Sequence, residues 1–241
     1  MTKNKLKKFK EMTGFDNLYQ PEFSEVLNKK FHLYGKWKES VFNNTNPIVL
    51  ELGCGKGEYS VGLAERYPEK NFIGIDIKGA RIFRGAKTAL QKNLKNVAFI
   101  RTRVDFVQSF FAKNEVNEIW FTFPDPQAKR IRKRLSSSLF LNRYTDFLVD
   151  NALIHLKTDN KLFYEYTKAL AIENKFKINY ASDNVYDDNN LPEEVINIQT
   201  FYENQFLAKN NKINYLEFNL NNILPFNEPK EFNDKFVLVN S

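Results

Sequence analysis

Between residues 47 and 174 the chain alternates short apolar runs with longer segments in which apolar residues recur at helical spacing. Short apolar runs bounded by glycine or proline are typical of strands buried in a parallel sheet. The expected strands span 47–52, 71–76, 97–101, 119–123, 153–158, 176–182 and 213–220, and the expected helices span 58–67, 79–93 and 160–174. This alternation predicts an α/β fold, with a mostly parallel seven-stranded sheet and helices on both faces.

The two ends of the chain differ from this central region. Five of the first ten residues are lysine, and a helix is expected near residues 21–31. We therefore expect a basic, partly helical N-terminal extension over residues 1–45, one domain over residues 46–222 and a C-terminal tail over residues 223–241. The net charge of +7, from 36 Lys+Arg against 29 Asp+Glu, suits a polyanionic partner but does not identify one.

The composition argues against a membrane protein, a disulfide-stabilised protein and a metalloprotein. No apolar stretch reaches the roughly 18–20 residues that a membrane helix needs, and the N-terminus lacks the apolar segment of a signal peptide. The single cysteine, Cys54, cannot form an intramolecular disulfide, and two histidines do not predict a His-rich metal site. We expect a cytoplasmic protein, a monomer or a homodimer, that binds no metal and no membrane.

A glycine-rich loop, ELGCGKG over residues 51–57, joins the first expected strand to the first expected helix. Gly53, Gly55 and Gly57 allow a sharp turn and a close approach of the backbone to a ligand. Their G-x-G-x-G spacing differs from the G-x-G-x-x-G fingerprint of dinucleotide sites. With the acidic Glu51 before it, the loop resembles motif one of class I S-adenosylmethionine-dependent methyltransferases. The alternative is an ordinary strand-to-helix turn that binds nothing.

Two further residues bear on the chemistry of this loop. Asp76 ends the second expected strand, where a carboxylate can accept hydrogen bonds from both hydroxyls of a ribose, although the same position would serve NAD. Cys54 lies inside the loop, whereas cytosine-C5 methyltransferases carry their nucleophilic cysteine in a separate loop after the fourth strand. We therefore interpret Cys54 as a small apolar filler and disfavour a covalent mechanism.

The fourth expected strand ends in a Pro-Asp-Pro turn followed by a basic run, FPDPQAKRIRKRL over residues 123–135. Ligands of open α/β sheets bind outside the carboxyl ends of the strands, so we expect Asp125 in the same crevice as the glycine loop. Five positive charges fall within six positions of this run, which favours contact with nucleic-acid phosphates. The alternative is a strand-ending turn followed by a solvated basic helix.

The same stretch resembles the F-P-D-P-W-x-K-x-R-x-x-K-R-R signature of the bacterial tRNA (guanine-N7)-methyltransferases. Two later segments agree with that family in their order and spacing. The end of the fifth expected strand, LKTD over residues 156–159, is similar to an L-K-T-D element there. Residues 200–203, TFYE, resemble its T-x-Y-E element and are followed by Phe206, although T-x-Y-E can also be a helix cap. The resemblance covers about residues 48–220.

This resemblance implies a Rossmann-like class I methyltransferase fold, S-adenosyl-L-methionine as cofactor and tRNA as partner. It implies methyl transfer to N7 of the guanine at position 46 in the variable loop, with Asp125 as the catalytic carboxylate. The residues implied for the cofactor site are Glu51, Gly53, Gly55, Gly57, Asp76, Arg103 and Asp125. The residues implied for the substrate site are Lys129, Asp159, Thr200, Phe201, Tyr202 and Glu203. The residues expected to contact the tRNA backbone are Arg130, Arg132, Lys133 and Arg134.

The chain departs from the family pattern at two places. Gln127 replaces the usual Trp after Pro-Asp-Pro, so any packing or stacking by that aromatic ring is absent. An Asp commonly follows the third strand near the adenine, and here Arg103 occupies that position, with Asp105 two residues later. We expect Arg103 to contact the adenine, with Asp105 as the alternative.

Three other functions fit parts of this pattern. A small-molecule methyltransferase would share the glycine loop but would have no use for the basic run. An NAD-dependent oxidoreductase is argued against by the glycine spacing and by the lack of an evident proton donor. A non-catalytic RNA-binding protein with the same fold is argued against by the intact Glu51, Asp76 and Asp125.

Overall fold

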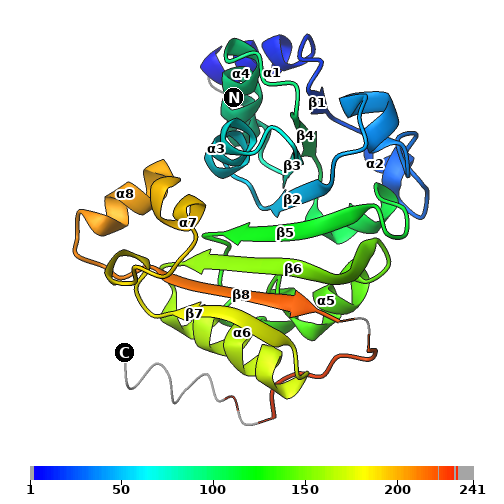
Figure 1. The fold of residues 1–241 in the computed structure, drawn as a ribbon. Coiled ribbons are helices and arrows are strands. Elements are labelled where there is room, and N and C mark those ends of the chain that lie inside the picture. The colour runs from blue at the N-terminus through cyan, green and yellow to red at the C-terminus, as the bar shows by residue number, and fades with distance from the viewer. Residues whose placement is uncertain (1–2, 222, 231, 233–241) are drawn as a thin grey trace.

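The computed structural model describes residues 3–221, 223–230 and 232. Its centre is an eight-stranded sheet in the order β1-β4-β3-β2-β5-β6-β8-β7 (Figure 1). Strand β8 is antiparallel to both β6 and β7, and the other neighbouring strands are parallel. The strands are β1 (Leu18–Tyr19), β2 (Ile48–Leu52), β3 (Asn71–Asp76), β4 (Val97–Arg101), β5 (Val116–Thr122), β6 (Leu148–Thr158), β7 (Lys177–Ser182) and β8 (Asn214–Leu220).

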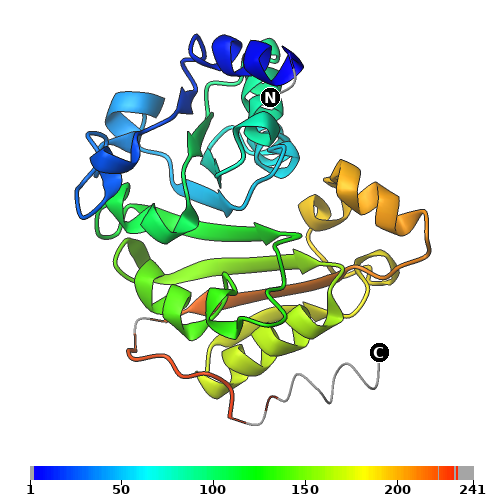
Figure 2. The same ribbon diagram turned by 180° about the vertical axis from the view of Figure 1, so that it is seen from behind.

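Helices cover both faces of the sheet, as predicted. The α-helices are α1 (Lys3–Met12), α2 (Phe23–Val26), α3 (Glu58–Arg66), α4 (Gly79–Gln91), α5 (Ser138–Tyr144), α6 (Lys161–Glu173), α7 (Glu193–Asn197) and α8 (Phe201–Leu207). One apolar core joins α3 and α4 to one face, and the other joins α5 and α6 to the opposite face. Helix α6 lies behind the sheet in Figure 1 and in front of it in Figure 2, which is the reverse view.

The mostly parallel α/β sheet is therefore confirmed, and all seven expected strands are present. The eighth strand, β1, pairs in parallel with β4 at the sheet edge. Two residues of strand give too short an apolar pattern to be predicted from periodicity. Strand β6 begins five residues earlier than expected, at Leu148, and contains Asn151 with a positive φ of 56°.

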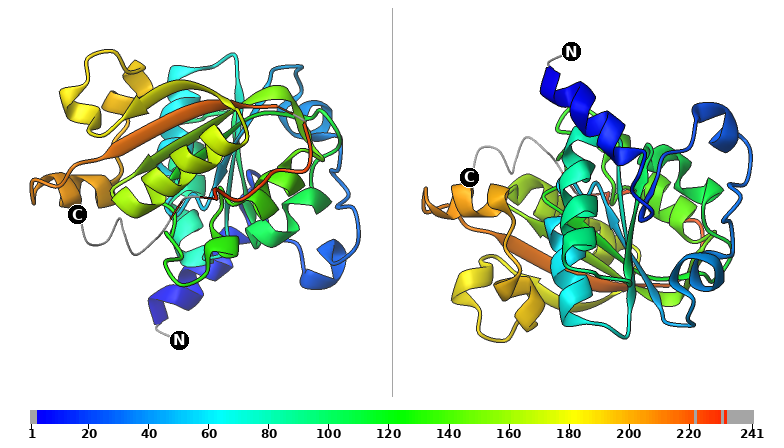
Figure 3. Two further views of the ribbon diagram at one scale, coloured as in Figure 1. Left: turned by 90° about the horizontal axis from the view of Figure 1, so that it is seen from below. Right: turned by 90° about the horizontal axis from the view of Figure 1, so that it is seen from above.

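The N-terminal segment that the structure describes before β2, residues 3–45, packs into the main body. Trp37 is fully buried and its indole N–H donates to the carbonyl of Phe110 at 2.8 Å. Met12 is 1% exposed at the end of α1, which lies alongside α4 (Figure 3). The helix expected over residues 21–31 is wrong in its extent, because α2 is a single turn. The chain leaves helical geometry at Leu27, which has ψ 111°, and Asn28 has a positive φ of 55°.

Candidate active site

A cleft of about 480 Å³ opens where strands β2 to β5 end. Its walls include one residue from the end of each strand or from the loop that follows it: Gly53, Asp76, Thr102 and Phe123. The order of the strands reverses at β2, which has β3 on one side and β5 on the other. Ligands of open α/β sheets bind at such a switch point, and the volume falls in the usual range of about 300–1,000 Å³ for small-molecule sites.

The glycine loop begins at the cleft, where Gly53 lines the wall, and its last position, Gly57, accepts only glycine. Gly53, Gly55 and Gly57 have φ values of 81°, 56° and 67°. A Cβ on Gly57 would lie 2.6 Å from the ring of Phe99, which is closer than van der Waals contact allows. Asp76 lies against the loop, and its carboxylate accepts the N–H of Gly55 at 2.9 Å. The loop and the acid that were singled out in the sequence therefore meet.

Glu51 lies beneath the loop and is 3% exposed. Its carboxylate accepts the backbone N–H of Ser60 at 2.8 Å and the hydroxyls of Ser60 and Thr122. Burial raises the pKa of Glu51 to about 7, although these hydrogen bonds oppose the shift. The carboxylate thus faces α3 and β5 and is not among the residues that line the cleft.

Arg103 and Asp105, the two candidates for the adenine site, both line the cleft and bond each other. The Arg103 guanidinium donates to Asp105 Oδ2 at 3.2 and 3.3 Å. Lys133 reaches Asp105 Oδ1 at 3.3 Å from the opposite wall. Partial burial raises the pKa of Asp105, but the bonds from Arg103 and Lys133 outweigh it, so the net pKa lies below its ordinary value.

Asp125 lines the same cleft from the turn after β5. Its Oδ1 accepts the N–H of Gln127 at 2.9 Å, and Gln127 has a positive φ of 47°. This Asx-type turn holds one carboxylate oxygen against the backbone. The catalytic carboxylate expected from the sequence, Gly53 of the glycine loop and Asp76 therefore line one cleft.

The chain is similar to known methyltransferases over most of its length. A family model described as a putative methyltransferase matches residues 45–216. A tRNA (guanine-N(7)-)-methyltransferase of Christiangramia forsetii is 52% identical over 91% of this chain and 99% of its own length. A protein of the same name from Bacteroides fragilis is 47% identical over 90% of this chain and 86% of its own length.

The chain belongs to the tRNA (guanine-N7)-methyltransferase family. The NAD-dependent oxidoreductase considered from the sequence is therefore wrong. Among solved structures, the 16S rRNA methyltransferase KamB has a TM-score of 0.61 at 15% identity, over 82% of this chain and 99% of its own. An antibiotic-related methyltransferase has a TM-score of 0.55 at 20% identity, over 74% of this chain and 89% of its own. These two structural similarities show the fold and nothing about the reaction.

In this member of the family, the basic run differs from a solvated helix. It forms only a 3₁₀ turn at Ile131–Lys133, and four of its five cations are exposed: Lys129, Arg130, Arg132 and Lys133. Arg134 is fully buried, with its Nε donating to the carbonyl of Pro126 at 3.0 Å and its guanidinium 4.3 Å from the ring centroid of Tyr166. The expected contact of Arg134 with tRNA phosphates is therefore corrected, because the side chain faces the interior.

The TFYE segment of the tRNA (guanine-N7)-methyltransferase pattern opens α8. Thr200 and Glu203 form a capping box, so the helix-cap interpretation is confirmed. Glu203 is fully buried, 2.7 Å from the Nζ of Lys157, and also accepts the Tyr186 hydroxyl at 2.6 Å. Glu203 does not reach the cleft. Lys157 belongs to the LKTD segment, but its burial and its pairing with Glu203 were not predicted, because nothing local distinguishes a buried lysine at a strand end from an exposed one.

The two exposed residues of this segment, Phe201 and Tyr202, lie in different surroundings. The Tyr202 ring is 5.6 Å from that of Phe123, which lines the cleft, and its hydroxyl bonds the Asp159 carboxyl. Burial raises the pKa of Asp159, and the Tyr202 bond opposes the shift. Phe201 lies under Lys56 of the glycine loop, with the ammonium 3.9 Å from the ring centroid. Tyr202, with Asp159 bonded to it, thus lies beside the cleft, whereas Phe201 packs against Lys56, which does not line the cleft.

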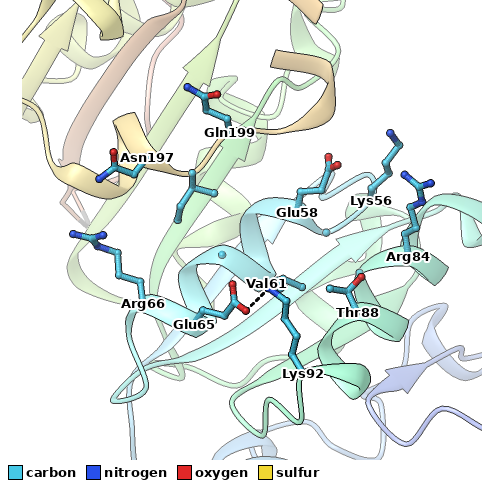
Figure 4. A pocket seen from close by; sticks show the side chains of 14 residues that line it. Lys56, Glu58, Val61, Glu65, Arg66, Arg84, Thr88, Lys92, Asn197 and Gln199 are labelled. Atoms are coloured by element: carbon cyan, nitrogen blue, oxygen red, sulfur yellow. Dashed lines mark hydrogen bonds and ion pairs between the residues drawn. The ribbon is translucent and has the colours of Figure 1, made fainter. Parts of the chain in front are cut away.

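A larger groove of about 710 Å³ lies between α3, α4 and residues 197–199 (Figure 4). Lys92 pairs with Glu65 within it, and Arg66 pairs with Glu193 at its rim. The groove is lined by Lys56 and Gly57 at the end of the glycine loop, but it contains none of Asp76, Arg103 or Asp125. The smaller cleft is therefore the better candidate for the active site.

Membrane-spanning helices and metal-binding clusters are both absent from the part of the chain that the structure describes. No helix there is both long and apolar enough to cross a membrane. Among the same residues, no three His, Cys, Asp or Glu side chains are grouped so that they could hold a metal ion.

Proposed function

We propose that this chain transfers the methyl group of S-adenosyl-L-methionine to N7 of the guanine at position 46 in the variable loop of tRNA. Membership of the tRNA (guanine-N7)-methyltransferase family supports the reaction. The observation that carries the proposal is the position of Asp125. It lies on the wall of the cleft that also holds Gly53 of the glycine loop and Asp76, and it leads directly into the exposed basic run.

The volume and the polar lining of the cleft support this cofactor. Gly53, Gly55 and Gly57 adopt positive φ and carry no Cβ, so the backbone of the loop can approach a ligand closely. Asp76 would accept hydrogen bonds from the ribose, and Arg103 would contact the adenine in place of the usual acid. When bound, the cofactor supplies a methyl group on a positively charged sulfonium. Glu51 acts indirectly in this proposal, since its buried carboxylate bonds Ser60 of α3 and Thr122 of β5.

Guanine N7 carries a lone pair and no proton, so the residues around it need not remove one. Holding the two reactants in line can itself lower a bimolecular barrier by about 7–11 kcal/mol. The methylated base is cationic, and the Asp125 carboxylate would stabilise that developing charge. Lys129, Asp159, Phe201 and Tyr202 would hold the substrate nucleotide, while Thr200 and Glu203 hold the helix that carries the two aromatic rings.

The tRNA backbone would contact the exposed cations of the basic run: Lys129, Arg130, Arg132 and Lys133. Arg134 has no part in this contact, because its side chain is buried. Position 46 lies in the tRNA core, so methylation requires that nucleotide to leave its stacked position.

The test is incubation of the purified protein with labelled S-adenosylmethionine and unmodified tRNA transcripts, followed by nucleoside analysis. We expect 7-methylguanosine, and we expect it to disappear when guanine 46 is replaced. Label on another nucleoside would refute the assigned reaction. Cofactor and tRNA binding without any label would favour a non-catalytic RNA-binding protein, and label on small acceptors alone would favour a small-molecule methyltransferase.

A further inference from the structure

The described part of the C-terminal segment does not line the cleft and is anchored to α5 and to the end of α6. Phe226 is 5% exposed and its ring lies 5.0 Å from that of Phe176. The backbone N–H of Asn227 donates to Asn174 Oδ1 at 2.7 Å. These contacts bring Glu228 to the first turn of α5, which begins directly after the basic run.

The Glu228 carboxylate joins the C-terminal segment to both α5 and α6. Its Oε1 accepts the backbone N–H and the hydroxyl of Ser138, at 3.0 and 2.7 Å. Its Oε2 accepts the hydroxyl of Tyr166 on α6 at 2.6 Å. Charge-assisted hydrogen bonds of this kind are about twice as strong as neutral ones. The carboxylate therefore fixes the start of α5 and the orientation of Tyr166 together.

Tyr166 in turn supports the loop that carries the catalytic carboxylate. Its ring, 1% exposed, lies 4.3 Å from the guanidinium of the fully buried Arg134. Arg134 donates from Nε to the carbonyl of Pro126, at 3.0 Å, and so closes the loop between residues 126 and 134. Pro126 follows Asp125 directly. A continuous set of contacts thus runs from Glu228 through Tyr166 and Arg134 to the residue beside Asp125.

We propose that Glu228 is a positioning residue for methyl transfer, holding the loop of residues 125–135 in place through Tyr166 and Ser138. This inference rests on the proposed function in that Asp125 is taken as the catalytic carboxylate. Misplacement of a reacting group by about 1 Å can cost about 100-fold in rate. Loss of an indirect support is a smaller disturbance, and we expect the kcat of Glu228→Ala to fall about tenfold.

The experiment compares Glu228→Ala, Glu228→Gln and Tyr166→Phe with the control Lys230→Ala. Lys230 is in the same segment and pairs with Glu173 of α6 at 3.4 Å, but its side chain is 80% exposed and its ion pair leads to α6 and not to the loop. Glu228→Gln should keep most of the activity, because its amide oxygen can accept both Ser138 bonds and its amino group can donate to the Tyr166 hydroxyl. Glu228→Ala and Tyr166→Phe should be non-additive in a double-mutant cycle.

Two measurements are made below the melting temperature of every variant. The first is kcat and KM for tRNA, where we expect kcat to fall in Glu228→Ala while KM stays within about twofold. The second is hydrogen exchange of the 125–135 amides in the free protein, which we expect to quicken in Glu228→Ala and not in Lys230→Ala. Unchanged kcat and exchange, with only a lower Tm, would overturn the inference.

The exchange measurement also separates the inference from the proposed function. If the wild-type protein made no 7-methylguanosine while Glu228→Ala still loosened residues 125–135, the proposed function would fail and the positioning of the loop would stand. If the wild type were active and all variants had the same kcat, the proposed function would stand and the positioning role of Glu228 would fail.

Discussion

Lys157 and Glu203 form a fully buried ion pair, with Nζ and Oε1 separated by 2.7 Å, that joins strand β6 to helix α8. The Lys157 ammonium also donates to the carbonyls of Val195 and Ile198, at 2.6 and 3.1 Å. Burial lowers the pKa of Lys157, and the Glu203 carboxylate opposes that shift. The pair fastens residues 195–203 to the sheet, so it sets where Phe201 and Tyr202 lie.

Lys157→Met should destabilise the protein by about 3–5 kcal/mol, because it leaves the Glu203 carboxylate buried without its cation. The free energy of unfolding in urea measures this loss. The double variant Lys157→Met/Glu203→Gln should recover part of it by removing both charges. The control is Lys161→Met, an exposed lysine with pairs to Glu165 and Asp183, which should cost less than about 1 kcal/mol. Equal losses of stability in Lys157→Met and Lys161→Met would contradict the buried ion pair between Lys157 and Glu203.

Asp125→Asn should lower the kcat of methyl transfer about 100- to 1,000-fold, a range typical of removing one electrostatic stabiliser. The amide oxygen can still accept the Gln127 N–H, so this variant removes the charge and preserves the turn. Asp125→Ala should abolish transfer. In both variants tRNA binding, measured by filter retention, should stay within a few-fold. If binding and transfer were lost together in a folded protein, Asp125 would serve tRNA binding at least as much as catalysis.

The stability of the free protein should depend on pH through Glu51. Its folded pKa of about 7 lies above the ordinary 4.5, so the fold favours the protonated carboxyl. This contribution is fully present below pH 4.5 and is lost as pH rises through about 7; the difference in pKa corresponds to about 3 kcal/mol. The free energy of unfolding in urea, measured at several pH values for the wild type and for Glu51→Gln, isolates the contribution of Glu51. A wild-type stability that rose relative to Glu51→Gln over this interval would refute the assignment.

Arg103→Ala should weaken cofactor binding about tenfold, which calorimetry with S-adenosylhomocysteine can measure. The reason is that the guanidinium lines the cleft where the family commonly places an acid near the adenine. Asp105→Asn should weaken binding less than threefold, because the Asp105 carboxylate is already shared between Arg103 and Lys133. The reverse ranking of the two variants would assign the adenine contact to Asp105.

The affinity for tRNA should fall with salt according to the number of exposed cations in the basic run. Four remain after the burial of Arg134, so log K should fall against log salt with a slope of about −2.8, using about −0.7 per phosphate contact. Arg132→Ala should reduce the steepness of that slope by about 0.7. A slope in Arg132→Ala identical to that of the wild type would exclude Arg132 from the phosphate contacts.

Sequence alone was sufficient for the features that depend on local pattern. Apolar runs and helical periodicity marked the seven strands and the helices α3, α4 and α6 to within a few residues, except at the start of β6, but they did not mark the ten-residue helix α1. The glycine loop and Asp76 were expected in one crevice with Asp125, because parallel strands present their carboxyl ends at the same edge. The family resemblance rested on the same local motifs.

The tertiary structure decided which of the motif's polar residues face the cleft. Arg134 and Lys133 are adjacent in the sequence, yet one is buried under Tyr166 and the other is exposed at the cleft. Likewise, Glu203 and Tyr202 share one motif, but Glu203 turns inward to Lys157. The partners that bury these charges come from 32 and 46 residues away in the chain. Periodicity describes only near neighbours, so contacts of this kind arise only when the whole chain is folded.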